Sequence, residues 1–411
     1  MWPFRRKEKI IRTTVPVTLH AKYDAAQTTR ENIRHWSMAD GLSADAAANS
    51  DVRKKLRERA RYEVANNSYA KGIVLTLAND CVGTGPRLQV LTADDELNKK
   101  IETAFSQWSH SIGLASKLRT MRMAKSTDGE TFGILTGNNK LYGPVKLDLH
   151  LVEADRVTTP WLDQRLKAKD QRDVIDGIIL DESGDPSAYT ILHYHPGDLQ
   201  VSINNYDVID AEAVIHWFRA DRPAQHRGVP EITPALPLFA QLRRYTLAVL
   251  GAAETAADFA AVLFTDAPAN GEAAQVEPMD IIELEKRMAT VLPDGWKLGQ
   301  IKAEQPATAY GEFKREILNE IARCLNLPYN IAACNSSGYN YASGRLDWQI
   351  FARAIRVEQS DMAAVVLDKI LSAWVYEAML SSEFAVLRTL SYLPHQWFFD
   401  GNEHVDPAKE A

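Results

Sequence analysis

The stretch AVIHWFRADRPAQHRGVPEITPAL (213–236) divides the sequence into two differently patterned regions. Its first six residues, AVIHWF, are mostly β-branched and aromatic, which is typical of a strand. Pro230 and the residues after it begin a long apolar helical run, and proline suits a first helical turn because its missing N–H has no partner there. We therefore expect a mixed region of helices and strands before this stretch and a mainly helical region after it.

The region before the junction alternates helical and strand patterns. A helix is predicted over 52–83, where Ile73, Val74 and Leu77 recur at helical spacing and GTGP (83–86) ends the run. Further helices are predicted over 96–110 and 114–130, and strands over 131–136, 145–152, 176–195 (a hairpin) and 213–218. Residues 52–218 are thus predicted to form one mixed α+β domain. The basic cluster at the start of the first helix is interpreted as a solvated helix face rather than a phosphate site: Arg53, Lys54, Lys55, Arg57, Arg59, Arg61.

The region after the junction reads as two helices around a small insert, followed by a loop and a third helix. The first helix covers 230–264, and the second, 310–327, places Ile317, Ile321 and Leu325 on one face. Between them we expect a loop at 266–278, a short helix at 279–292 and a strand at 296–301. A polar loop (330–344) then leads into the longest predicted helix, 345–382.

Composition excludes several classes of protein. The 411 residues include 47 Lys and Arg against 54 Asp and Glu, a net charge of −7, which argues against a broad basic surface for nucleic acid. The three cysteines (Cys81, Cys324, Cys334) are far apart and favour a reducing, cytoplasmic folding site. The most apolar stretch, 248–264, contains two carboxylates and is predicted to be a packed helix rather than a membrane span.

Motifs for catalysis are sparse. No GxxxxGK[ST] sequence is present, and the cysteines have no patterned histidine partner. His193 and His195 share one face of a strand, and Asp128-Gly129-Glu130 is acidic, so a metal-dependent hydrolase or nuclease using these four side chains is an alternative hypothesis. We favour a polar strand face and a turn, and assign no catalytic residue, metal or cofactor. A scaffold or adaptor of α+β type is a further alternative.

Six segments resemble, in the same order, the sequence blocks of the lambda family of tailed-phage portal proteins. They are NNSYAKGIVLTLANDCVGTGPRLQ (66–89), DGETFGIL (128–135), GIILDESGDPSAYTI (177–191), HWFRADRPAQHRGVPEITPAL (216–236), LPYNIAACNSSGYNYASGRLDWQIF (327–351) and FFDGNEHVDPAKEA (398–411). An R-P-x-Q-x-R-G-x-P pattern is matched by Arg222, Pro223, Gln225, Arg227, Gly228 and Pro230. An N-Y-[SA]-S-x-R pattern is matched by Asn340, Tyr341, Ala342, Ser343 and Arg345.

The resemblance implies an α+β, ring-forming portal-type subunit. Its parts would be an N-terminal arm (1–50), the first part of the wing (51–230), stem helices (231–259 and 307–327), a small α/β clip (260–306), a tunnel loop (328–344), and a long wing helix with the wing return (345–411). Family members usually continue beyond the D-P-x-K-E-A segment, so a reduced or missing crown is expected. The apolar stripe of a helix as long as 345–382 would need a neighbouring subunit to cover it.

The resemblance also implies roles for particular residues. The tunnel-loop residues facing the DNA channel would be Asn335, Ser336, Ser337 and Asn340. The stem cations, which would line the channel, pair between subunits or lie in solvent, are Arg243, Arg244, Lys314 and Arg315. The clip residues that dock the packaging motor would be Glu283, Glu285 and Lys286. Uncharged groups suit a constriction through which DNA slides, because each phosphate neutralised by a cation adds affinity.

A portal protein also implies particular partners and a particular place. We expect a homo-oligomeric ring, a dodecamer, that contacts the terminase large subunit, the major capsid protein and scaffold, and a head–tail adaptor. Double-stranded DNA would pass through it without sequence-specific binding. The ring would lie at the portal vertex of the virion capsid, after assembly in the host cytoplasm, with no cofactor and no membrane.

Overall fold

The structure, a computed structural model, describes residues 30, 33–160, 174–198, 205–258, 262–265, 296–299, 310–390 and 392–401 of the chain. The chain divides into two compact units, Met1–Ser43 and Ala44–Ala411, and each is described by itself. In the first unit, residues 33–38 form turns and expose Ile33, Trp36 and Met38. Every element below belongs to the second unit.

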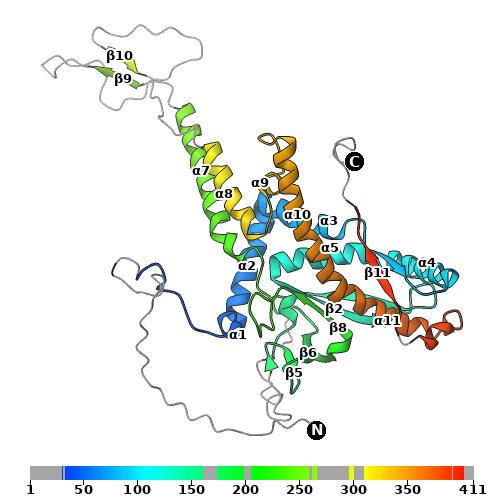
Figure 1. The fold of residues 1–411 in the computed structure, drawn as a ribbon. Helices are drawn as coiled ribbons and strands as arrows, with labels where there is room; N and C mark the ends of the chain where they lie inside the picture. The colour runs from blue at the N-terminus through cyan, green and yellow to red at the C-terminus, as the bar shows by residue number, and fades with distance from the viewer. Residues whose placement is uncertain are drawn as a thin grey trace. The chain divides into compact units, whose positions relative to one another are not determined.

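A three-stranded antiparallel sheet lies at the centre of the α+β part (Figure 1). Its strands, in the order β3–β2–β8, are β3 (Leu147–Val152), β2 (Glu130–Gly137) and β8 (Val214–Phe218). Side chains alternate between the two faces of a strand, so Ile215 and Trp217 of β8 belong to one core cluster and Val214 to another. The sheet is therefore buried on both faces.

Helices cover one face of this sheet. They include α4 (Asp95–Ser111) and α5 (Leu114–Asp128), whose Phe105, Trp108 and Leu118 share a core with Trp217. The same core contains residues from a long helical segment made of α10 (Tyr341–Met362), a π-helical turn (Ala363–Leu367) and α11 (Asp368–Ala378).

A second antiparallel sheet packs against the other face. Its order is β4–β5–β6–β7, with β4 (Val174–Ile175), β5 (Ile178–Leu180), β6 (Pro186–Leu192) and β7 (Tyr206–Asp210). Phe132 of the first sheet and Tyr189 and Ile191 of the second are buried in one cluster. The α+β part thus has three layers: helices, one sheet, and a second sheet.

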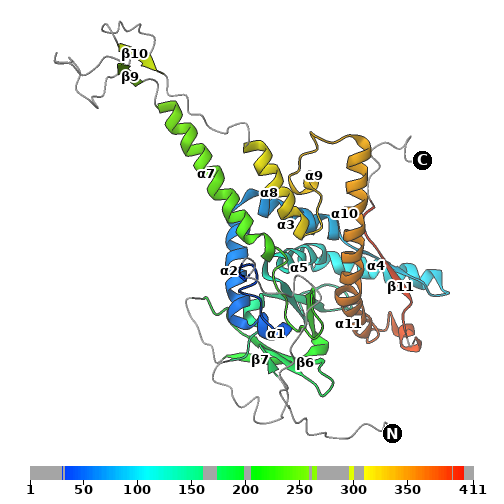
Figure 2. The same cartoon turned by 60° about the vertical axis from the view of Figure 1, so that its left-hand side comes forward.

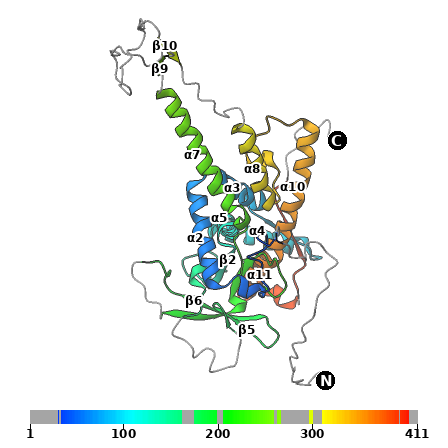
Figure 3. The same ribbon diagram turned by 90° about the vertical axis from the view of Figure 1, so that its left-hand side faces the viewer.

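A second core is built mainly by helices. It is shared by α2 (Ser50–Asn66), α3 (Ser68–Val82), α7 (Leu236–Asp258), α8 (Tyr310–Cys324), α9 (Tyr329–Ala332) and α10. Within it, Phe239 of α7, Ile321 of α8 and Phe351 of α10 are almost completely buried. α7 and α8 lie side by side, as Figures 2 and 3 show, and Tyr245 packs on Phe313 with ring centroids 4.6 Å apart.

Two short strand pairs complete the second unit. β1 (Arg87–Val90) pairs with β11 (His395–Phe398), and β9 (Val262–Thr265) pairs with β10 (Trp296–Gly299), both antiparallel. The remaining elements are the helix α1 (Ala44–Ala47) and the 3-10 turns Ala154–Arg156, Ala211–Ala213, Thr233–Ala235 and Ala385–Thr389. No described helix is both long enough and apolar enough to cross a membrane.

Most predicted elements are present in the structure, with differences at particular places. The single helix predicted over 52–83 is two helices, α2 and α3, because Asn67 is extended between them and caps the start of α3. The return strand of the hairpin predicted over 176–195 ends at Leu192, so His193 and His195 lie beyond it. The helix predicted over 230–264 begins at Leu236 and ends at Asp258, and residues 262–264 belong to a strand instead. The helix predicted from 345 to 382 begins at Tyr341 and ends at Ala378. The polar loop predicted at 330–344 contains most of α9 and the first residues of α10. The helix predicted at 279–292 lies outside the described residues.

Candidate functional site

The polar loop between α9 and α10 exposes all four residues that are predicted to face a channel. Three of them have side chains that cap no helix. Asn335, Ser336 and Ser337 are exposed, and the side chain of Asn335 accepts a hydrogen bond from the backbone N–H of Ser337 at 2.9 Å. None of these side chains carries a charge. The loop can therefore offer hydrogen-bonding groups to a polyanion without the long-range attraction that cations exert.

The fourth residue, Asn340, also has a structural role. Its side chain accepts a hydrogen bond from the backbone N–H of Ser343 at 2.9 Å, and the hydroxyl of Ser343 accepts one from the backbone N–H of Asn340 at 3.1 Å. This reciprocal capping box satisfies two backbone donors that would otherwise have no partner in the first turn of α10. Asn340 thus fixes where the loop ends and the helix begins.

Two of the four predicted stem cations are held by neighbouring helices. Arg243 of α7 donates to Glu63 of α2, with Nη1 2.7 Å from Oε2. Lys314 of α8 lies over the ring of Tyr69, 5.0 Å from its centroid, and a hydrogen bond to the Tyr69 side chain raises the pKa of Lys314.

The other two cations are exposed. Arg244 lies on the exposed face of α7, and Arg315 of α8 lies beside Glu316, with Nε 3.5 Å from Oε1. The clip residues Glu283, Glu285 and Lys286 lie outside the described residues.

A buried ion cluster surrounds Arg227, a residue of the R-P-x-Q-x-R-G-x-P pattern. Its guanidinium binds Glu130 of β2, and Nη1 also donates to the backbone carbonyl of Val157 at 3.0 Å. His216 of β8 contacts the same carboxylate, with Nε2 3.0 Å from Oε2. Burial alone would raise the pKa of Glu130, but Arg227 and the hydrogen bond from His216 hold it well below its usual value. The carboxylate is therefore charged and serves as the centre of the cluster.

The adjacent Gly228 allows the backbone to approach this cluster closely. A Cβ atom at position 228 would lie 2.1 Å from the carbonyl oxygen of Gly129, a distance that real Cβ atoms do not adopt. Gly129 itself has a φ of 90°, in the left-handed region that favours glycine. Glycine at both positions thus brings the junction against the first residues of β2.

A second buried ion cluster joins the junction to α5 and α10. Arg122 of α5 lies 2.9 Å from Glu231, which directly follows the R-P-x-Q-x-R-G-x-P pattern. One turn later in α5, Lys125 lies 2.6 Å from Glu358 and 3.2 Å from Asp361, both on α10. Burial alone would raise the pKa of Glu231, but Arg122 and Lys125 lower it. The residues just before α7 and the C-terminal end of α10 are thus both attached to α5.

The hydrolase hypothesis has no assembled metal site in the described part of the chain. Asp128 binds Arg61, with Nε 2.7 Å from Oδ1. Glu130 binds Arg227, and His193 binds Asp207, with Nε2 2.9 Å from Oδ2. Guanidinium groups thus occupy the positions around these carboxylates that a cation would need, and no group of three or more described His, Cys, Asp or Glu residues could hold a metal ion.

The interpretation of the first basic cluster was partly wrong. Arg53 and Arg57 of α2 are buried rather than solvated, and Arg57 and Arg61 both pair with Asp155, with nitrogen–oxygen distances of 3.0 and 2.7 Å. Arg53 forms an ion pair with Asp176. The signal that could have identified this face is the spacing of Arg53, Arg57 and Arg61, since residues four apart lie above one another on a helix.

A family model described as phage portal protein, lambda family, matches residues 29–359. Among solved structures, a chain in the neck of an empty gene transfer agent (GTA) particle, computed with C6 symmetry, is similar to this chain. The TM-score is 0.54 at 14% identity, over 82% of this chain and 83% of that chain. That likeness shows a shared fold.

Two further solved structures are more distant. A chain in the neck of a native GTA particle, computed with C12 symmetry, has a TM-score of 0.48 at 14% identity, over 85% of this chain and 84% of that chain. An HK97-family phage portal protein from Corynebacterium diphtheriae has a TM-score of 0.32 at 11% identity, over 82% and 94%. No curated protein matches the sequence.

Proposed function

Because the chain belongs to the lambda family of phage portal proteins, we propose that it forms a ring at one vertex of a phage-type capsid and conducts double-stranded DNA during packaging and ejection. The family match, which extends from residue 29 to residue 359, carries this proposal. The ring is a homo-oligomer, a dodecamer, without catalytic activity of its own. It resides in the virion and assembles in the host cytoplasm.

The arrangement of α7, α8 and the polar loop supports a channel-lining role. α7 and α8 form an adjacent pair that shares one core with the middle of α10, and the polar loop connects α9 of this group to α10. In the proposed ring, 231–259 and 307–327 are the stem and 328–344 is the tunnel loop. Exposed, uncharged groups at Asn335, Ser336 and Ser337 would contact the DNA backbone without retaining it.

The remaining parts receive roles in the same assembly. Residues 51–230 form the first part of the wing, and 345–411 the long helix and the wing return. The insert 260–306 is the clip, which docks the terminase large subunit and later the head–tail adaptor through Glu283, Glu285 and Lys286. The outer surface of the ring contacts the major capsid protein and the scaffold.

The mass and symmetry of the purified, full-length assembly test this function. Mass photometry and negative-stain imaging should give one annular species with a central hole wide enough for a DNA duplex. A preparation that contains only single polypeptides under every ionic condition would overturn the proposal.

A further inference from the structure

One side of α10 is apolar and exposed. Leu346, Ile350 and Val357 are 63%, 57% and 67% exposed, and their spacing of four and seven residues places them on one side of the helix. Phe351 and Ile355, on the opposite side, are buried in the helical core. We call these three exposed residues the apolar stripe of α10. Within a single chain it faces no protein core.

A second apolar surface lies on α7. Leu242 is buried, and residues 243–254 contain no buried side chain although the helix continues to Asp258. Leu247 and Leu250 are 62% and 55% exposed and lie on one side of the helix with Glu254. We call Leu247 and Leu250 the apolar edge of α7.

The two surfaces belong to opposite ends of one row of helices. In Figures 1, 2 and 3, α8 lies between α7 and α10. The stripe and the edge are therefore different patches on helices that do not adjoin each other. Two different patches that fit one another produce head-to-tail contacts, and such contacts close into a ring when the rotation between copies allows it.

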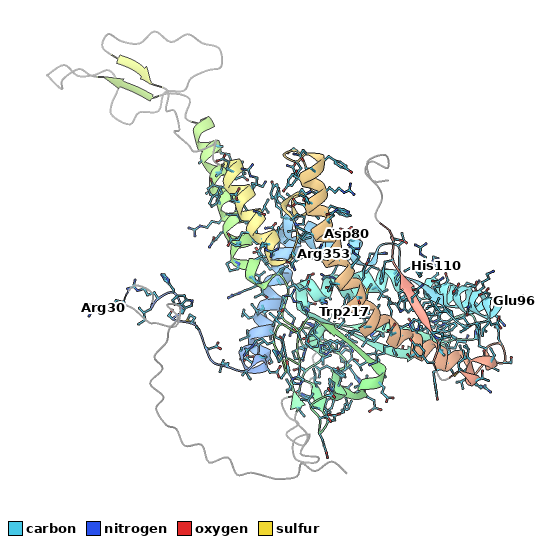
Figure 4. The ribbon with its side chains drawn as sticks, viewed as in Figure 1. Arg30, Asp80, Glu96, His110, Trp217 and Arg353 are labelled. Carbon is cyan, nitrogen blue, oxygen red and sulfur yellow. The ribbon has the colours of Figure 1, made fainter. Side chains whose placement is uncertain are left out.

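The charges beside the two patches are opposite in sign. Arg353 lies in the α10 stripe between Ile350 and Val357, on the helix where Figure 4 labels it. Glu254 follows Leu250 by one helical turn on α7. Among the described residues, neither Arg353 nor Glu254 forms an ion pair. A cation within one apolar surface and an anion at the end of the other are complementary.

We propose that the apolar stripe of α10 in one copy of this chain packs against the apolar edge of α7 in the next copy, with Arg353 facing Glu254. This inference rests on the proposed ring and names the surfaces through which the ring closes. The contact is heterologous, so every copy uses both patches once. It also explains why both helices carry leucine, isoleucine or valine where a single subunit leaves them exposed.

Disulfide cross-linking of the full-length protein tests the contact. The exposed Cys334 and the half-buried Cys324 are first replaced by serine, while Cys81 is buried and is kept. The double variant Ile350→Cys with Leu247→Cys should form a ladder of covalent oligomers on oxidation, and each single variant should not. As a matched control, Tyr376→Cys with Leu247→Cys pairs the same α7 position with a residue of α11 that is 72% exposed, and it should give no ladder.

Charge reversal gives an independent test. Arg353→Glu and Glu254→Arg should each reduce the fraction of protein in rings at least tenfold, and the double variant should restore it. If the wild-type protein forms rings but the Ile350→Cys, Leu247→Cys variant gives no cross-link, and charge reversal causes no loss of rings, this contact is overturned and the portal function still stands. Failure of the wild-type protein to form any ring would overturn the portal proposal itself.

Discussion

Arg227 and Glu130 form an ion pair inside the protein through two nitrogens of the guanidinium. Nε lies 3.0 Å from Oε1 and 2.8 Å from Oε2, and Nη2 lies 2.6 Å from Oε1. The two side chains are 1% and 0% exposed. The pair joins the residues that precede α7 to the central strand β2. The junction that divides the sequence into two regions is therefore fixed to the sheet by a buried charge pair.

Removal of one partner of this pair should lower the free energy of unfolding. Arg227→Met removes the cation but leaves the Glu130 carboxylate buried, and removal of one partner from a buried pair costs about 3–5 kcal/mol. The free energy of unfolding, measured by urea titration with tryptophan fluorescence, should fall by that amount. Lys55→Met, which removes an exposed pair with Glu58, is the control and should leave the free energy of unfolding nearly unchanged, because solvent screens exposed pairs. Equal losses in the two variants would show that burial does not set the strength of the Arg227 pair.

Gly228 should tolerate no side chain. Gly228→Ala would place a methyl group 2.1 Å from the carbonyl oxygen of Gly129, so the backbone of the junction must move. We expect a loss of stability of about 1–3 kcal/mol, as for an overpacked core. Gly72→Ala, on an exposed position of α3 with no atom within 4 Å of the new methyl group, should instead stabilise by about 0.5–1 kcal/mol. A Gly228→Ala protein as stable as the wild type would contradict the close approach.

Stability should fall in mild acid because of His216. Burial lowers the pKa of His216 below its usual 6.5, and the imidazole stacks on Phe132 and Phe218 with centroids 4.2 and 4.5 Å apart. Below pH 6.5 the unfolded chain therefore binds a proton that the folded protein does not, and stability decreases by up to about 1.4 kcal/mol per pH unit. The lowered pKa of Glu130 predicts a further loss below its usual 4.5.

Urea titrations between pH 7 and pH 5 can measure this dependence. In His216→Gln, the free energy of unfolding should fall less steeply than in the wild type between pH 6.5 and 5.5. The window begins at 6.5 because that is the usual pKa of histidine. His110→Gln changes an exposed histidine of α4, labelled in Figure 4, and should leave the decline unchanged. Parallel curves for the wild type and His216→Gln would remove His216 as the cause.

Shortening the polar loop should reduce DNA packaging without preventing ring assembly. Replacement of residues 333–339 by a shorter Gly-Ser linker keeps Asn340 and its hydrogen bonds to Ser343, so α10 retains its cap. Rings should still form, because the proposed contacts lie on α7 and α10, whereas packaged DNA per particle should fall severalfold. Substitution of Ser336 and Ser337 by alanine is the milder control. Normal genome filling with the shortened loop would count against a tunnel-loop role.

The clip can be tested by charge reversal. Glu283→Lys, Glu285→Lys or Lys286→Glu should weaken binding of the terminase large subunit several-fold in a pull-down or by biolayer interferometry, because charged docking surfaces depend on complementary potential. Ring mass should not change. Glu182→Lys, in the exposed turn of the β5–β6 hairpin, serves as a matched reversal outside the clip. Unchanged terminase binding in all three clip variants would remove their assigned role.

The sequence predicted those elements whose signals are local. Ile317 and Ile321 at helical spacing identified α8, and the turn at residues 183–186 identified the β5–β6 hairpin. The start of α10 was missed by four residues although Asn340 and Ser343 form a capping box there, a signal present in the sequence. β1 and β11 were missed because each has four residues and its partner is remote in the sequence.

The candidate site was predicted less completely than the fold. The exposure of Asn335, Ser336 and Ser337 agrees with a polar loop, whereas the buried ion clusters were not predicted. A charged residue in an amphipathic pattern is normally assigned to solvent, and only a partner distant in the sequence makes its burial possible. Lys125 is 1% exposed because Glu358 and Asp361, more than two hundred residues later, meet it. No local pattern contains that information.

The pairing of β1 with β11 sets the order of events when the chain is made on a ribosome. β11 is translated about 300 residues after β1, which at roughly 5–20 residues per second is a delay of about 15–60 s. During that interval the backbone donors and acceptors that β1 presents to β11 have only water or other chains to bond. The nascent polypeptide would have to shield this edge until β11 is made, and in the proposed ring that interval delays the step at which a finished subunit joins its neighbours.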